Sequence, residues 1–232
     1  MDRELLKNIE SVLKRVRNAA DRSGRSTENI KLVAVSKTHP VEIVRAAIEA
    51  GLEVFGENKV QEAEEKIVAI GREAAEWHLI GHLQSNKARR AVQLFDVIES
   101  VDSIDLATRL ERICKEEVRD KLSVFVQVDL AGEKTKSGVN ENELPELVGY
   151  LQRCERLKLD GLMVLPPYYE DPEMTRPFFQ RLRVIRDELA SANVFAGGIG
   201  ELSMGMSHDF EIAIEEGATV VRVGTAIFGE RT

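Results

Sequence analysis

The sequence predicts an α/β protein with a single (β/α)8 barrel of the TIM type and one extra helix at its amino terminus. Short apolar runs alternate with longer amphipathic segments along the whole chain, and there are about eight such runs, as in a closed parallel barrel. No Ser-rich or low-complexity linker interrupts the pattern. With 232 residues, 43% of them hydrophobic, residues 1–232 are expected to form one domain with a substantial core.

The first expected element is an amphipathic helix that ends near Gly24. Its apolar residues recur at helical spacing with charged residues between them: Leu5, Leu6, Ile9, Val12, Leu13 and Val16. Strands are then expected near residues 31–36, 53–56, 77–81, 97–101, 123–130, 159–165, 201–205 and 219–224. Helices are expected near residues 41–50, 59–70, 86–93, 104–118, 142–154, 174–191 and 209–216. Because residues 226–232 are too few for a full outer helix, the first helix is expected to cover that part of the barrel wall.

Composition excludes several classes of function. The net charge is -8, and phosphate neutralisation along nucleic acid needs concentrated Lys and Arg, so broad nucleic-acid binding is not expected. Cys114 and Cys154 both fall in helix-like segments, which favours free thiols in a reducing compartment, and a cytoplasmic location is expected. Neither a signal peptide nor a segment apolar enough to span a bilayer is evident.

Lys37 is the leading candidate for a chemical role. The apolar run at residues 32–35 delivers it to a strand end, and active sites of (β/α) barrels lie where strands emerge into loops. A lysine ammonium partly stripped of water loses its proton easily enough to attack an aldehyde. The alternative is a solvated lysine that opens a loop. Lys136 lies in a polar loop and Lys87 is expected to open a helix, so neither is as well placed as Lys37.

A phosphate site is expected at the far end of the chain. Gly224 and Thr225 end the last strand with backbone amides, and loops after the seventh and eighth strands commonly bind phosphate in this barrel. Ser207 follows the seventh strand and would donate a hydroxyl there or cap the next helix. Arg222 shares strand parity with Gly224 and points into the barrel, toward a ligand or an internal salt bridge. A reactive amine beside a phosphate cradle describes a pyridoxal phosphate pocket.

Three further residues are weaker candidates. His82 follows a strand end and would lie near a bound ring or act as an acid or base, with a hydrogen-bonded structural role as the alternative. Met163 would contact the ring or belong to the core, and Asn58 would contact the ligand or cap a helix. No two Cys or His residues have the spacing of zinc ligands on one element, so no metal is expected.

Several blocks of sequence, taken in order, resemble the pyridoxal phosphate homeostasis protein family, whose fold is similar to the N-terminal barrel of alanine racemase. The resemblance spans nearly the whole chain. It is carried by residues 33–37 (VAVSK), 55–62 (FGENKVQE), 77–87 (WHLIGHLQSNK), 161–163 (GLM), 202–207 (LSMGMS) and 221–229 (VRVGTAIFG). One departure is His208, where the family more often has an acidic residue, which puts the phosphate geometry at that turn in question.

The resemblance implies that Lys37 holds pyridoxal 5'-phosphate as an internal aldimine. It also implies that Ser207, Gly224 and Thr225 grip the phosphate and that Arg222 faces the pyridine nitrogen or, as the alternative, the phosphate. An arginine beside that nitrogen disfavours its protonation and weakens the ring as an electron sink, which fits a carrier better than a catalyst.

The expected function is therefore vitamin B6 homeostasis and amino-acid balance without robust catalysis. Related racemases take a second base from a tyrosine on another domain, and none of Tyr150, Tyr168 and Tyr169 clearly replaces it. Expected partners are the cofactor and apo forms of enzymes that use it, with no nucleic acid or membrane, and the protein is expected as a monomer or weak homodimer. The alternatives are a small pyridoxal phosphate-dependent racemase or decarboxylase, and a phosphate-sugar barrel enzyme without the cofactor.

Overall fold

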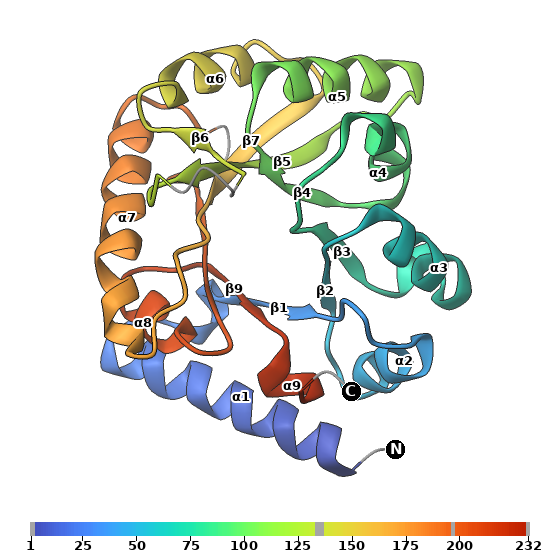
Figure 1. Cartoon of the computed structure of the whole chain (residues 1–232), viewed down its shortest axis with the longest axis vertical. Coiled ribbons are helices and arrows are strands. Elements are labelled where there is room, and N and C mark those ends of the chain that lie inside the picture. Colours follow the sequence, from blue (N-terminus) through green and yellow to red (C-terminus); the bar gives the residue numbers. More distant parts are fainter. Residues whose placement is uncertain (1–2, 133–136, 196–197, 231–232) are drawn as a thin grey trace.

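Eight parallel strands close into a barrel in the computed structural model, which describes residues 3–132, 137–195 and 198–230. The barrel strands are β1 (Lys31–Val35), β2 (Val54–Glu57), β3 (Glu76–Leu79), β4 (Val97–Val101), β5 (Leu122–Asp129), β7 (Leu157–Met163), β8 (Glu201–Met206) and β9 (Val220–Val223). β1 pairs with both β2 and β9, and pairing of β4 with β5 closes the ring. The predicted (β/α)8 barrel is thus confirmed (Figure 1).

Helices form an outer ring around the strands (Figure 1). They are α1 (Arg3–Arg22), α2 (Val41–Glu49), α3 (Val60–Ile70), α4 (Ala88–Leu94), α5 (Ile104–Glu116), α6 (Leu144–Leu151), α7 (Arg176–Ser191), α8 (Phe210–Glu215) and α9 (Thr225–Phe228). Short 3-10 turns are η1 (Thr27–Asn29), η2 (Arg72–Ala74), η3 (Ser85–Lys87) and η4 (Pro172–Thr175). The helices expected near 86–93 and 174–191 each begin with one of these turns. Because barrel strands come from both ends of the sequence, we propose that residues 1–232 form a single domain.

One strand lies outside the ring. β6 (Val139–Asn140) pairs with the end of β5, through Val128 opposite Val139, and belongs to the connection between β5 and α6. Two residues are too few to produce a periodic pattern, so this strand could not be predicted from the sequence.

The strands bury both of their faces, as expected for a parallel sheet covered by helices. Alternate side chains point into the barrel, where a small apolar cluster fills the interior: Val33, Val54, Val97, Phe125, Met163 and Val220. The opposite faces pack against the helices in a much larger cluster that includes Phe55, Trp77 and Phe210. The outer layer therefore supplies most of the core, and polar side chains have room inside the barrel.

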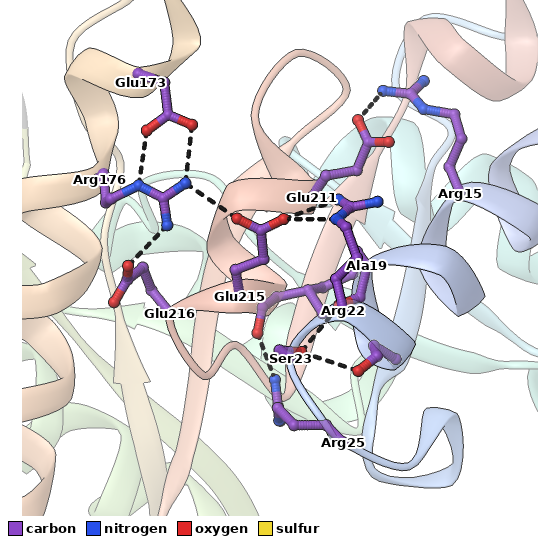
Figure 2. A network of polar contacts seen from close by, with 12 residues as sticks. Arg15, Ala19, Arg22, Ser23, Arg25, Glu173, Arg176, Glu211, Glu215 and Glu216 are labelled. Carbon is purple, nitrogen blue, oxygen red and sulfur yellow. Dashed lines mark hydrogen bonds and ion pairs between the residues drawn. The ribbon is translucent and has the colours of Figure 1, made fainter.

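Helix α1 lies across α8 and α9, as expected from the short chain after the last strand (Figure 1). Its buried stripe is Leu5, Ile9, Val12, Val16, Ala19 and Ala20. Ion pairs fix its polar side to α8, with Arg15 2.7 Å from Glu211 and Arg22 2.8 Å from Glu215 (Figure 2). Arg176 of α7 also contacts Glu215, at 3.0 Å, so that this carboxylate connects α1, α7 and α8.

Candidate functional site

The carboxyl ends of β1 and β9 form one pocket. These strands pair in register, with Ala34 opposite Val223, so the residues that follow each strand lie side by side. A small pocket of about 20 Å³ is lined by Val35, Lys37, His39, Gly224, Thr225 and Gly229. The structure thus brings together three residues singled out from the sequence, Lys37, Gly224 and Thr225.

Lys37 is half-buried and lies two residues after the end of β1. Its neighbour Ser36 points outward, where its hydroxyl donates to the Glu57 carboxylate at 2.7 Å, so the alternation of the strand turns Lys37 toward the barrel mouth. Thr38 then has a φ of 68°, a left-handed conformation that is strained for a β-branched residue. The chain therefore turns sharply immediately after the lysine that it presents.

Ser207 joins the loops after β8 and β9. Its hydroxyl oxygen accepts hydrogen bonds from the backbone amides of Gly224 at 3.1 Å and Ala226 at 3.3 Å. A Cβ at residue 224 would lie 3.3 Å from the Val35 carbonyl oxygen, a tight contact, so glycine lets the end of β9 lie close to β1. Converging backbone amides and a hydroxyl suit a phosphate group.

Close packing of β8 against α8 and a hydrogen bond to Asp209 hold the loop that carries Ser207. Gly205 has a φ of 91°, and a Cβ there would lie 2.8 Å from the Phe210 Cα, so only glycine allows β8 to pass this close to α8. The Asp209 carboxylate accepts the Met206 amide at 2.7 Å, and burial raises the pKa of Asp209. His208, the departure noted in the sequence, turns away and contacts the carbonyl oxygens of Tyr169 and Glu170, each at 3.2 Å.

Arg222 lies inside the barrel, with 2% of its surface exposed. Its guanidinium donates to the Ser203 hydroxyl and, at 2.8 Å, to the Val164 carbonyl. The Glu99 carboxylate lies 3.8 Å away. The internal salt bridge considered from the sequence is therefore present, and the two bonds to β8 and to the end of β7 fix the direction of the guanidinium.

The remaining candidates are not among the residues that line this pocket. Asn58 is half-buried after β2, where its backbone packs against Gly81. His82 has a 56% exposed side chain, 3.6 Å from the Asp102 carboxylate. Met163 is fully buried in the interior cluster. Lys136, the rival lysine, lies outside the described residues.

Three groups near the site were not singled out from the sequence. His39 lines the pocket and packs against Phe228 in a tilted ring contact, with 5.0 Å between ring centroids; its position two residues after Lys37 was the available signal. The Glu57 carboxylate at the end of β2 pairs with the Lys66 ammonium of α3 at 2.6 Å. Glu99 faces Arg222, and its place between Val97 and Val101 marked it as an acid on the inward face of a strand.

Within residues 3–132, 137–195 and 198–230, no group of three or more His, Cys, Asp or Glu side chains could hold a metal ion. None of the helices in those same ranges is both long and apolar enough to span a bilayer. Cys114 and Cys154 are free thiols, and burial raises the pKa of each to about 11.

Comparison with known proteins adds independent information. The alanine racemase N-terminal domain family matches residues 6–232. The pyridoxal phosphate homeostasis protein of Aquifex aeolicus is 44% identical over 224 residues, which cover 96% of each chain. The protein of the same name from Escherichia coli K12 is 41% identical over 231 residues, which cover 98% of this chain and 97% of the relative.

Solved structures show the same similarity. PipY of Synechococcus elongatus, determined with pyridoxal phosphate bound, has a TM-score of 0.81 and 39% identity over 93% of this chain and 100% of its own. Alanine racemase of Clostridium difficile in complex with cycloserine has a TM-score of 0.72 at 18% identity, over 98% of this chain but 60% of the racemase. The second likeness concerns the fold alone.

Proposed function

Because this chain belongs to the alanine racemase N-terminal domain family and is similar over nearly its full length to pyridoxal phosphate homeostasis proteins, we propose that it binds pyridoxal 5'-phosphate and acts in its homeostasis. The observation that carries the proposal is the pocket shared by Lys37, Gly224 and Thr225. Bound pyridoxal phosphate supplies an aldehyde carbon and an electron-withdrawing pyridine ring. The residues present fit such a group, because Lys37 provides an amine and the backbone amides of Gly224 and Ala226 converge with the Ser207 hydroxyl beside it.

Each residue has a distinct proposed task. Lys37 would hold the cofactor covalently through its side-chain amine, with the aldehyde oxygen leaving as water. Ser207, Gly224 and Thr225 bind the phosphate, and Arg222 faces the pyridine nitrogen. The bonds from Arg222 to Ser203 and Val164 support the nitrogen over the phosphate, since they direct its guanidinium toward β7 and β8. Asn58, His82 and Met163 are proposed at the edge of the site.

We propose that the protein carries the cofactor without robust catalysis. An amino-acid racemase needs a base on each face of the substrate carbon. Tyr150 lies on α6 outside the barrel, Tyr168 is 76% exposed beside His208, and Tyr169 packs against Phe178. These positions support a site in which none of the three tyrosines supplies a second base opposite Lys37. The proposed recipients are apo forms of enzymes that use pyridoxal phosphate, and the proposed location is the cytoplasm.

The experiment loads the purified protein with pyridoxal phosphate and presents it to an apoenzyme trap. We expect visible absorption from the bound cofactor and transfer to the trap faster than cofactor loss without it. The same preparation with alanine and other amino acids should show no racemisation or decarboxylation above a blank. Sustained turnover would contradict the carrier role and favour a small pyridoxal phosphate enzyme, and failure to bind would contradict the whole proposal.

Replacing Ser207 with alanine should weaken binding through the phosphate alone. A hydrogen bond to a charged group contributes about 1.5–3 kcal/mol, so the Kd for pyridoxal phosphate should rise by roughly 10–100-fold. The Kd for pyridoxal, which lacks the phosphate, should hardly change. Equal losses for both ligands, measured by absorption titration, would show that Ser207 only supports the loop.

A further inference from the structure

A continuous chain of polar side chains crosses the interior of the barrel. His78 Nδ1 lies 2.6 Å from one oxygen of Glu99, and the Ser203 hydroxyl donates to the other. Arg222 donates to the same Ser203 hydroxyl. These four residues come from β3, β4, β8 and β9, and each is at most 2% exposed. The chain His78–Glu99–Ser203–Arg222 therefore links two buried cationic side chains through one buried carboxylate.

Both ring nitrogens of His78 face carboxylates. Its Nε2 lies 2.8 Å from Glu76 and its Nδ1 lies 2.6 Å from Glu99, so with both carboxylates ionised each nitrogen donates and the ring is an imidazolium. Burial alone would lower the pKa of His78, but the hydrogen bonds to Glu76 and Glu99 hold it above its usual value. Burial would raise the pKa of Glu99, yet the bond from His78 and the charges of His78 and Arg222 hold it below its usual value.

The chain begins at the end of the barrel opposite Lys37. A cavity of about 1040 Å³ opens at the amino-terminal ends of the strands, and His78 is part of its wall. At this end of the barrel, the Lys31 ammonium lies 2.7 Å from the Glu76 carboxylate. His78 faces two carboxylates, Glu76 of its own strand and Glu99 of β4. At the other end, Arg222 faces the charges of Glu99 and Asp209. Glu99 is thus shared between His78, which lies in the wall of this cavity, and Arg222 on β9.

We propose that Glu99 is a positioning residue for Arg222, and that the chain His78–Glu99–Ser203–Arg222 sets the direction and the electrostatic potential that Arg222 presents to the cofactor ring. This inference rests on the proposed function. Removing the Glu99 charge leaves His78 with the Glu76 carboxylate alone and takes away one of the two acids that Arg222 faces. Removing the His78 charge instead leaves Arg222 as the cation that compensates Glu99. The two changes must therefore alter the potential at the pocket in opposite directions.

The test measures the pH midpoint of the visible absorption of the Lys37-bound cofactor in two variants. Glu99→Gln adds net positive charge near the ring and should lower the midpoint by roughly 1 pH unit, the scale of a unit charge several ångströms away in a protein interior. His78→Gln removes positive charge and should raise it by a similar amount. The double variant should return close to the wild-type midpoint.

Glu111→Gln is the matched control, since Glu111 is 8% exposed and accepts backbone amides of Glu155, Arg156 and Leu157 outside the barrel. Its midpoint should not move. Shifts of the same sign in both test variants, or none, would overturn the inference while leaving cofactor binding intact. If Glu99→Gln does not fold, the inference is tested by His78→Gln alone, which should raise the pH midpoint of the cofactor absorption. A wild-type protein that binds no cofactor would instead overturn the proposed function.

Discussion

Lys37→Ala should abolish covalent attachment of pyridoxal phosphate. Wild-type protein incubated with the cofactor and reduced with borohydride should carry a stable label on the peptide that contains Lys37, and the variant should carry none there. Ser207, Gly224 and Arg222 would still contact the cofactor, so weak reversible binding should remain. We expect a loss of affinity of at least about 100-fold, equivalent to about 2.7 kcal/mol, measured by equilibrium dialysis.

The matched control is Lys87→Ala, which removes the lysine at the end of η3. This variant should label at Lys37 like the wild type. Label that persists in Lys37→Ala at a single other lysine would move the covalent site, whereas label scattered over many lysines would show that the pocket does not select its amine. A clean loss confined to Lys37→Ala would establish the covalent role proposed from its place at the end of β1.

The fold could be predicted because parallel strands leave a strong local signal. A strand buried on both faces becomes a nearly continuous apolar run, as at Leu122–Asp129, and intervening helices show one apolar stripe. β6 has two residues and α9 has four, so neither is long enough to establish a period. The sequence therefore identified the barrel and its order of elements but not these two short segments.

In the candidate site, too, some residues could be predicted from the sequence and others could not. Lys37, Ser207, Gly224 and Thr225 were identified because each follows a strand, and the barrel topology then predicts that they share one mouth. Polar partners inside the structure could not be found this way. Ser203 and Glu99 are 104 residues apart, and only the closed ring of strands brings them into contact. Residue type and strand parity show that such groups point inward, but not which partner each one meets.

The buried ion pair between Lys66 and Glu57 predicts the second large effect, a loss of folding stability when Lys66 is replaced. Lys66 Nζ donates to the Glu57 carboxylate and to the Ser36 carbonyl, each at 2.6 Å, and both side chains are at most 6% exposed. Burial raises the pKa of Glu57, and Lys66 partly offsets that effect. The second oxygen of Glu57 is buried and has no hydrogen-bond partner among the described residues. Lys66 is thus the cation that compensates Glu57 and holds the residue that precedes Lys37.

Lys66→Met should therefore lower the free energy of unfolding by about 3–5 kcal/mol at neutral pH, because it leaves an uncompensated buried carboxylate. Thermal or urea unfolding measures the loss. Combining it with Glu57→Gln removes the charge and should recover most of the stability. Lys59→Met is the matched control, since Lys59 pairs with Glu62 through a 70% exposed side chain and should have little effect.

The stability deficit of the Lys66→Met variant should depend on pH, because it arises from the charge of Glu57. Without Lys66, the pKa of Glu57 rises further in the folded state, so the folded protein binds a proton that the unfolded chain releases. Stability then falls as pH rises from the unfolded pKa of glutamate, about 4.3, toward the raised folded pKa. The deficit relative to wild type should consequently shrink as pH is lowered from 7 toward 5. A deficit that is constant over this range would assign the loss to packing of the Lys66 side chain and not to the Glu57 charge.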